Sequence, residues 1–584
     1  MNHNLDIHPA PYRSRDGRAA EGAQRGTLSV PMNRARPGGP RVELAFVRLP
    51  ARSARPRAPI VFLTGGPGLS AIRAGAGRLF GWFEALRAHG DVVLLDQRGC
   101  GESRPVVDCA GALRLPIDRA MTRDEVRDEV RAAIRRCAEQ RTREGIDLAA
   151  FNTNESADDV ADLVRTLYGV PEAGETRVAL LGWSYGSHLA MAVVKRHEAL
   201  VDRAILAGPE GPDHTDKLPS RIQRHLEMIA TRVREDAAWR ERMPDLLATL
   251  RAVLDRADRE PARVPATGAE VADVTVGRFD LEWIISQGLA DPRFLRRLPS
   301  WLRRMEQGDF SGVARDPLLR GAFDELRTGL GGSLLRTCMD CASGASASRR
   351  ERIEREAREA LLGRTIDFPF PEVCAAIGNP DLGDDFRAAP RSSVPVLFIT
   401  GTLDCRTPAD NVLDLSGGFP HHRHLVVEDA GHGDLLLPTA VQHAIARFLD
   451  DGTVQSERVR ADERLVFEPG LPVLLFDGSC AFCRSQVAHL RRRAGSAVEF
   501  APFQEAAPRF PHLAVAELAR AVHFVDADGS VSRGAEAVFR ALAAPRGSHP
   551  LLWMYRRLPG FRPVVEWGYR QVARYRSRLG RRFM

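Results

Sequence analysis

Lysine is almost missing from this chain of 584 residues, in which it occurs only as Lys195 and Lys217. Arginine therefore supplies nearly all of the positive charge behind the formal net charge of +7. So uniform a preference indicates a compositional bias, and it weakens the nucleic-acid-binding interpretation that a basic chain would otherwise invite. We predict no nucleic-acid partner.

Long apolar runs are also missing. No stretch offers the roughly 18 uninterrupted apolar residues that a membrane span needs, and the N-terminal stretch lacks the apolar core of a signal peptide. The 9 cysteines are too few for a disulfide scaffold, and their odd number leaves at least one unpaired in a monomer. We expect a cytoplasmic protein without a transmembrane segment.

Length and patterning predict more than one domain of α/β class. The chain exceeds the roughly 250 to 300 residues at which single cores stop growing. Residues 1–40 are polar and predict a loose lead-in, and the alternation after them predicts a half-buried strand. Helical patterns separate short apolar runs, which predict a mostly parallel sheet with strands at 59–63, 91–96, 177–183, 203–208, 394–401 and 424–431.

Composition shifts place the expected domain boundaries. The first domain covers 25–451 and includes a long, Arg-rich helical insertion at about 212–370, which we interpret as a lid over one end of the sheet. A polar linker at 452–470 precedes a new buried strand, PVLLFDG. A second compact domain is therefore expected over 471–584.

A candidate nucleophile follows the strand at 177–183. That strand runs into Gly182-Trp183-Ser184-Tyr185-Gly186, after which a helical pattern begins. A sharp strand-to-helix turn exposes the serine hydroxyl, and the two glycines remove side chains that would clash. Ser184 is the predicted nucleophile.

A serine hydroxyl needs a base, and the base needs an orienting carboxylate. In the α/β-hydrolase fold these residues follow in the order serine, acid, histidine. His432, flanked by glycines after the last strand of the domain, is the predicted base. Asp404, just past the strand at 394–401, is the predicted acid, with Asp429 and Asp434 as competitors.

The glycine-rich segment TGGPG follows the strand at 59–63, where this fold supplies a backbone N–H to a tetrahedral oxyanion. Gly66 and the N–H of Tyr185 are the predicted donors of the oxyanion hole. Gly65 is the alternative to Gly66.

Together, the segments GGPG, DQRGCGES, GWSYGS, GTLDCRTP and GHG resemble the proline iminopeptidase and tripeptidyl aminopeptidase branch of the α/β-hydrolases. The resemblance covers roughly 25–450 and implies a serine hydrolase that cleaves a peptide or amide bond near an N-terminus. It implies that the turn at 96–99 buttresses the oxyanion loop, and that acidic residues bind the substrate α-amino group, with Glu210 as candidate. Thr64 replaces the usual histidine, and an esterase or lipase activity stays open.

The second domain carries Cys480-Ala481-Phe482-Cys483 at the start of a helical pattern. Cysteines at this spacing share one helix face, and the helix N-terminus favours the thiolate of Cys480, so that Cys480 would attack and Cys483 would resolve. A zinc site needs four ligands, and no second cysteine or histidine pair follows in this domain. We expect no metal and no cofactor. We interpret Cys338 and Cys341 as inert, with a disulfide or a metal site as alternatives.

The segments VLLFDGSCAFC, VEFAPFQ and HFVDADGSVSRGAEAVFRAL resemble the DCC family of thiol-disulfide oxidoreductases. The resemblance implies a thioredoxin-like fold and a thiol or disulfide partner. Val522 stands where thioredoxins carry a cis-proline, which favours a regulatory or binding role instead. A redox protein whose hydrolase half is a binding scaffold is therefore an alternative.

The end of the chain, from 546 to 584, is rich in arginine and aromatic residues. We interpret it as basic helices that pack on their own domain through their aromatic faces. An anionic membrane surface is the alternative partner.

Overall fold

The computed structural model describes residues 4–109, 111–169, 177–237, 239–264, 273–330, 333–378, 380–454, 457–468, 471–507, 510, 513–526, 530–546 and 548–580. It divides into two compact units. The first comprises Met1–Met228, Pro265–Leu295 and Arg315–Leu465, and the second comprises Ile229–Val264, Arg296–Ala314 and Val466–Met584. These units do not follow the expected domain boundaries, which we keep as a proposal.

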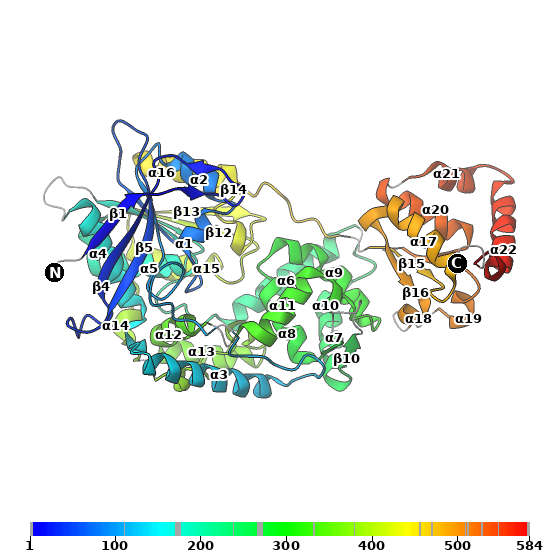
Figure 1. The fold of residues 1–584 in the computed structure, drawn as a ribbon, viewed down its shortest axis with the longest axis horizontal. Coiled ribbons are helices and arrows are strands. Elements are labelled where there is room, and N and C mark those ends of the chain that lie inside the picture. Colours follow the sequence, from blue (N-terminus) through cyan, green and yellow to red (C-terminus); the bar gives the residue numbers. More distant parts are fainter. Residues whose placement is uncertain are drawn as a thin grey trace. The chain divides into compact units, whose positions relative to one another are not determined.

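A ten-stranded sheet forms the centre of the first unit (Figure 1). In spatial order its strands are β1 (Leu5–Pro9), β4 (Gln24–Pro31), β5 (Arg41–Leu49), β7 (Val92–Leu95), β6 (Ile60–Leu63), β8 (Val178–Trp183), β9 (Val201–Ala207), β12 (Val396–Gly401), β13 (His422–Glu428) and β14 (Arg458–Arg460). Pairs from β1 to β7 are antiparallel, and pairs from β7 to β14 are parallel. The mostly parallel sheet predicted from the sequence is confirmed.

Continuous apolar runs form the central strands because both faces of the sheet are covered. In β6, Ile60 and Phe62 join a core that includes residues of α2 (Phe80–Leu86) and α16 (Thr439–Asp451). Val61 and Leu63 join the opposite core, with α4 (Thr153–Tyr168) and α5 (Tyr185–His197). Burial on both sides removes the alternation of polar and apolar residues that a one-sided strand shows.

The strand order brings distant loops to one edge of the sheet. β6 lies between β7 and β8, and it runs parallel to β8 with Leu63 opposite Gly182. Because parallel strands end at the same edge, the loop after β6 lies beside the turn after β8. The loops after β12 and β13 reach that edge as well.

Two segments of the sheet differ from the expectation. The described residues 4–40 do not form a loose lead-in, because β1 pairs with β4 and β4 pairs with β5. The short β14, inside the expected linker, pairs with β13. β1 and β14 are the edge strands of this sheet, each paired with one neighbour and only partly buried, so their side chains carry little apolar pattern.

The chain between β9 and β12 is mainly helical, as its pattern predicts. Its helices are α6 (Pro219–Glu235), α7 (Leu246–Arg259), α8 (Arg278–Gly288), α9 (Pro292–Glu306), α10 (Gly312–Arg315), α11 (Pro317–Asp324), α12 (Leu334–Ser343), α13 (Ala347–Ala357) and α14 (Gly383–Arg387). It also contains the short strands β10 (Ala262–Val264) and β11 (Val274–Val276).

Two disulfide bonds lie in the first unit. Cys341 on α12 pairs with Cys374, and Cys109 pairs with Cys137 on α3 (Arg123–Arg143). The interpretation of Cys341 as inert was therefore wrong. Its partner lies 33 residues further along the chain, a pairing that spacing alone does not reveal.

The C-terminal part of the second unit has its own mixed sheet, in the order β16 (Glu499–Pro502), β15 (Val473–Phe476), β17 (His523–Val525) and β18 (Val531–Arg533). Its longer helices are α17 (Ala481–Ala494), α20 (Ala535–Ala543), α21 (Pro550–Arg557) and α22 (Phe561–Gly580). α17 and α20 cover one face of the sheet, and they share an apolar core with β15, β16 and β17. Among the described residues, no helix has both the length and the apolar character needed to cross a membrane.

Candidate active site

Ser184 occupies a strained turn between β8 and α5. Its φ of 56° lies in the left-handed region, which a residue with a side chain adopts at a cost. Glycine is needed on both sides: a Cβ at Gly182 would lie 2.4 Å from the carbonyl oxygen of Gly186, and one at Gly186 would lie 1.8 Å from that of Leu63. The tight turn projects the serine side chain beyond the sheet.

The structure brings the three predicted triad residues together. Nε2 of His432 lies 2.8 Å from Oγ of Ser184, and Nδ1 of His432 lies 2.8 Å from Oδ2 of Asp404. The three side chains come from the turns after β8, β12 and β13, which meet at one edge of the sheet. The arrangement allows the imidazole to accept the serine proton while the carboxylate orients the ring.

Asp404 is held as a carboxylate by its neighbours. Burial by itself would raise the pKa of Asp404, but His432 and hydrogen bonds from Thr407 outweigh burial and lower it to about 2. The Thr407 hydroxyl donates to Oδ2 of Asp404 at 2.7 Å and lies 3.2 Å from Nδ1 of His432. Sequence reasoning missed Thr407, because a hydroxyl three residues after a candidate acid carries no local signal of this contact.

The glycine loop after β6 lies against the serine. A Cβ at Gly65 would come within 2.8 Å of the Cβ of Ser184, so only glycine permits this approach. Gly65 and Gly66 line the same cavity as Ser184, and Tyr185 begins the helix that follows the serine. Both glycines therefore remain candidate oxyanion donors beside the N–H of Tyr185.

Asp96 holds the oxyanion loop in place. Its carboxylate accepts hydrogen bonds from the Ser70 hydroxyl at 2.8 Å and from the backbone amides of Ile72 at 3.1 Å and Glu102 at 2.8 Å. These bonds tie the turn after β7 to the segment that follows the glycines. The contacts support the buttressing role expected for this turn.

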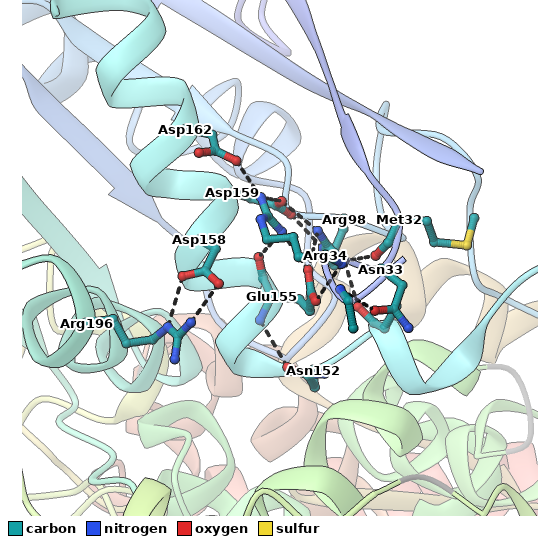
Figure 2. Close-up of polar contacts among 12 residues, drawn as sticks. Met32, Asn33, Arg34, Arg98, Asn152, Glu155, Asp158, Asp159, Asp162 and Arg196 are labelled. Carbon is teal, nitrogen blue, oxygen red and sulfur yellow. Dashed lines mark hydrogen bonds and ion pairs between the residues drawn. The ribbon is translucent and has the colours of Figure 1, made fainter. Parts of the chain in front are cut away.

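A buried ion-pair network fixes the other end of the same turn, as Figure 2 shows. Arg98 is fully buried and donates two hydrogen bonds to Asp159, at 2.6 and 2.7 Å. Arg34 bridges Asp159 to Glu155 and Asp162, with distances between 2.6 and 2.7 Å. Removing one member of such a network is costly, because the remaining buried charges keep only part of their compensation.

A cavity of about 320 Å³ opens onto Ser184 and His432. Charged side chains are unusually frequent in its wall, where the structure places Glu210, Asp216, Lys217, Arg336, Asp340, Asp367 and Arg406. Except for Glu210, these residues were not predicted, because their approach to Ser184 depends on contacts between segments far apart in the chain.

Two of these acids are poorly stabilised as carboxylates. Burial raises the pKa of Asp340 to about 7, and the nearby charge of Glu210 adds to this effect. Burial and the neighbouring Asp216 raise the pKa of Asp367 to about 7. Oδ2 of Asp367 is buried and has no hydrogen-bond partner among the described residues. A bound cation would stabilise the charged form of both acids.

Glu210 has a partner within the chain. Nζ of Lys217 lies 3.1 Å from Oε2 of Glu210. Burial raises the pKa of Glu210, but Lys217 and His188 outweigh it and lower the pKa below its ordinary value. Asp340 also has a partner, because Nε of Arg336 lies 3.2 Å from its Oδ2, whereas Oδ2 of Asp367 has none among the described residues.

The cysteine pair of the C-terminal domain lies at the start of α17. Cys480 is the N-cap residue, and its sulfur accepts a hydrogen bond from the Cys483 amide at 3.4 Å. Burial, together with a hydrogen bond to Cys480, raises the pKa of Cys483 to about 12. The backbone amide of Val522, the residue before β17, donates to the Tyr569 hydroxyl at 2.9 Å. Among the described residues, no cluster of three or more metal-binding side chains occurs.

The strand order and the strained turn after β8 are those of the α/β-hydrolase fold. Comparison with known families agrees. Residues 58–269 match the family described as alpha/beta hydrolase fold, residues 369–460 match TAP-like protein, and residues 474–582 match DCC1-like thiol-disulfide oxidoreductase. The chain therefore carries an α/β-hydrolase fold, a TAP-like segment and a DCC1-like domain in the predicted order, and both resemblances are confirmed.

Curated relatives match a limited part of the chain. Serine protease Hip1 of Mycobacterium tuberculosis is 28% identical over 200 residues, which are 33% of this chain and 37% of the relative. Putative hydrolase YuaR of Escherichia coli is 24% identical over 191 residues, which are 31% of this chain and 35% of the relative. The aligned region thus spans little more than a third of either relative.

Solved structures of similar proteins include proline iminopeptidase of Mycobacterium smegmatis, with 15% identity and a TM-score of 0.34. That comparison covers 73% of this chain and 98% of the solved one. A thermophilic esterase from Thermogutta terrifontis has 16% identity and a TM-score of 0.32, and covers 73% and 98% respectively.

Proposed function

We propose that the protein is a serine hydrolase that cleaves a peptide or amide bond near a free N-terminus. The observation that carries this proposal is the pair of 2.8 Å distances that link Ser184 through His432 to Asp404. The strained serine turn and the glycine loop beside it add the other parts that acyl transfer needs.

The reaction follows from these positions. Nε2 of His432 takes the proton of Ser184 as Oγ attacks the substrate carbonyl, and the Tyr185 amide with Gly66 or Gly65 binds the oxyanion. The C–N bond then breaks, and His432 returns the proton to the leaving amine. Water, deprotonated by His432, attacks the acyl-enzyme and releases the acid with the serine restored.

The acidic wall of the cavity supports a substrate with a protonated amine. Asp367 is buried and the Asp340 side chain is 12% exposed, and desolvation raises the pKa of both carboxyls even though Arg336 lies 3.2 Å from Asp340. An ammonium group would stabilise the charged form of both carboxyls. We therefore add Asp340 and Asp367 to Glu210 as residues that bind the α-amino group. A neutral acyl ester would gain nothing from these charges.

A fluorophosphonate probe and a substrate panel test the proposal. The protein should be labelled at Ser184, and Ser184→Ala should abolish labelling and turnover. A proline amide, a longer N-terminal peptide amide and short acyl esters should be compared, each amide also in its N-acetylated form. Preference for free-amino amides is expected. If neither form of the amides is turned over while the esters are, the protein is an esterase, and equal turnover of free and acetylated amides would remove the amino-group recognition.

We propose a second, separate function for Cys480 and Cys483 in thiol-disulfide exchange. The sulfur of Cys480 at a helix N-terminus supports this role, since that position favours a thiolate. Iodoacetamide trapping of the native full-length protein at pH 7 should modify Cys480 faster than the same cysteine in urea. Equal or slower modification would remove the redox proposal and leave the hydrolase proposal intact.

A further inference from the structure

One face of the C-terminal helix α22 carries exposed apolar side chains. Its inner face is fixed by Tyr569, which accepts a hydrogen bond from a backbone amide at 2.9 Å, and by Arg576, which lies 3.3 Å from Asp477. At 100° per residue, Val564 and Trp567 fall on the opposite face. Their exposed fractions of 65% and 60% agree with this placement. We expected the basic helices of the tail to pack on their own domain through their aromatic faces, which was wrong for the exposed Trp553, Trp567 and Tyr575.

Basic side chains accompany this apolar face. Arg570 and Arg574, one helical turn apart, are both exposed. Trp553, on the neighbouring helix α21, has an exposed fraction of 63%. We call the set of Trp553, Val564, Trp567, Arg570 and Arg574 the basic-aromatic patch.

Negative charge is missing from the patch. Glu566 is the only acid after residue 546, and it lies inward, where its carboxylate accepts the hydroxyl of Tyr555 at 2.9 Å. Within the described part of the chain, neither Arg570 nor Arg574 forms an ion pair with a carboxylate. The patch is therefore complementary to an anionic surface.

We propose that the basic-aromatic patch docks the protein on the surface of an anionic phospholipid bilayer. Tryptophan prefers the interface between lipid headgroups and acyl chains, and arginine keeps its charge among the headgroups while its stem covers apolar surface. Burial of the Val564 side chain in lipid would add to the binding free energy. On a nucleic acid this side chain would add little, because stacking on bases needs an aromatic ring. The combination of aliphatic, tryptophan and arginine side chains thus favours a membrane over a nucleic acid.

Vesicle co-sedimentation of the full-length protein tests the proposal. Phosphatidylcholine vesicles with and without 30% phosphatidylglycerol should be compared at about 20 and 300 mM salt. Binding should require the anionic lipid and weaken at the higher salt, because salt screens the attraction. Arg570→Gln with Arg574→Gln should weaken binding about 30-fold at low salt, since each arginine near an anionic surface contributes roughly five-fold.

The matched control is Arg355→Gln with Arg358→Gln, which removes the same charge from exposed positions on and beside α13. This control should bind like the unaltered protein, and labelling of Ser184 with fluorophosphonate should be unchanged in both double variants. Equal weakening by the control would overturn the proposal, because it would show general charge attraction without a defined surface. The proposal would also be overturned if the protein bound a duplex oligonucleotide through Arg570 and Arg574 but did not bind vesicles.

Tryptophan fluorescence gives a second readout. Brominated lipid in anionic vesicles should quench part of the emission of the bound protein. Trp553→Phe with Trp567→Phe should keep vesicle binding, since phenylalanine is also apolar, but should lose most of this quenching. Quenching that persists in this variant would refute the placement of the patch against lipid.

Discussion

Asp404→Asn tests whether the carboxylate after β12 is the acid of the triad. His432 and Thr407 lower the pKa of Asp404 from 3.8 to about 2 against the effect of burial. That shift corresponds to about 2.5 kcal/mol in favour of the charged carboxylate, or a factor of roughly 70. The loss of charge is only part of the effect. The amide also presents a different hydrogen-bonding group to His432, which selects the wrong imidazole tautomer, and a total loss of about 10³ to 10⁴ in kcat is expected.

The assay is turnover of the best substrate of the panel, together with the rate of fluorophosphonate labelling at Ser184. KM should change little, because Asp404 is not part of the cavity wall described above. Asp429→Asn and Asp434→Asn are matched controls, since both acids lie near His432 in the sequence. Asp429 has a φ of 61°, which asparagine also tolerates, and Asp434 lies 3.5 Å from Arg78. Activity within tenfold of normal in Asp404→Asn, with a large loss in either control, would refute the triad as assigned.

Three further changes test other parts of the structure. Arg98→Met should lower the free energy of unfolding, measured with urea, by up to about 3 kcal/mol, because the buried Asp159 loses two hydrogen bonds and keeps only Arg34 as an ionic partner. Adding Asp159→Leu should recover part of this loss. The raised pKa makes Asp340 neutral below about pH 7, so KM for a free-amino substrate should rise as pH falls through 7. Asp340→Asn should raise KM at pH 8 and flatten this pH dependence. An unchanged dependence of KM on pH in this variant would contradict the amino-group role of Asp340. In the folded Cys480→Ser variant, alkylation of Cys483 at pH 8 should be at least tenfold slower than in the same variant unfolded in urea, because burial raises the pKa of Cys483. Peptide mass spectrometry measures both rates. Equal rates would show that this thiol is not shielded.

The nucleophile could be found from sequence because its signal is local. A buried strand, two glycines and a helix within a short segment specify the strained turn at Ser184, and the flanking glycines single out His432. Thr407 escaped notice because a hydroxyl in a loop has many roles, and only the turn after β12 aims it at Asp404. The disulfide partner of Cys341 could not be predicted either, because several pairings of the cysteines are compatible with their spacing in the sequence.

Local sequence was enough to predict the buried strands, the serine turn and the succession of an α/β-hydrolase fold and a cysteine-pair domain, because these features depend on residues that are neighbours along the chain. The charges that line the cavity, the ion pair of Glu210 with Lys217, the buried Asp367 oxygen without a partner among the described residues and the outward side of α22 could be seen only in the folded chain. The physical reason is that burial and charge pairing depend on distances between segments far apart in the chain, and no local pattern encodes those distances.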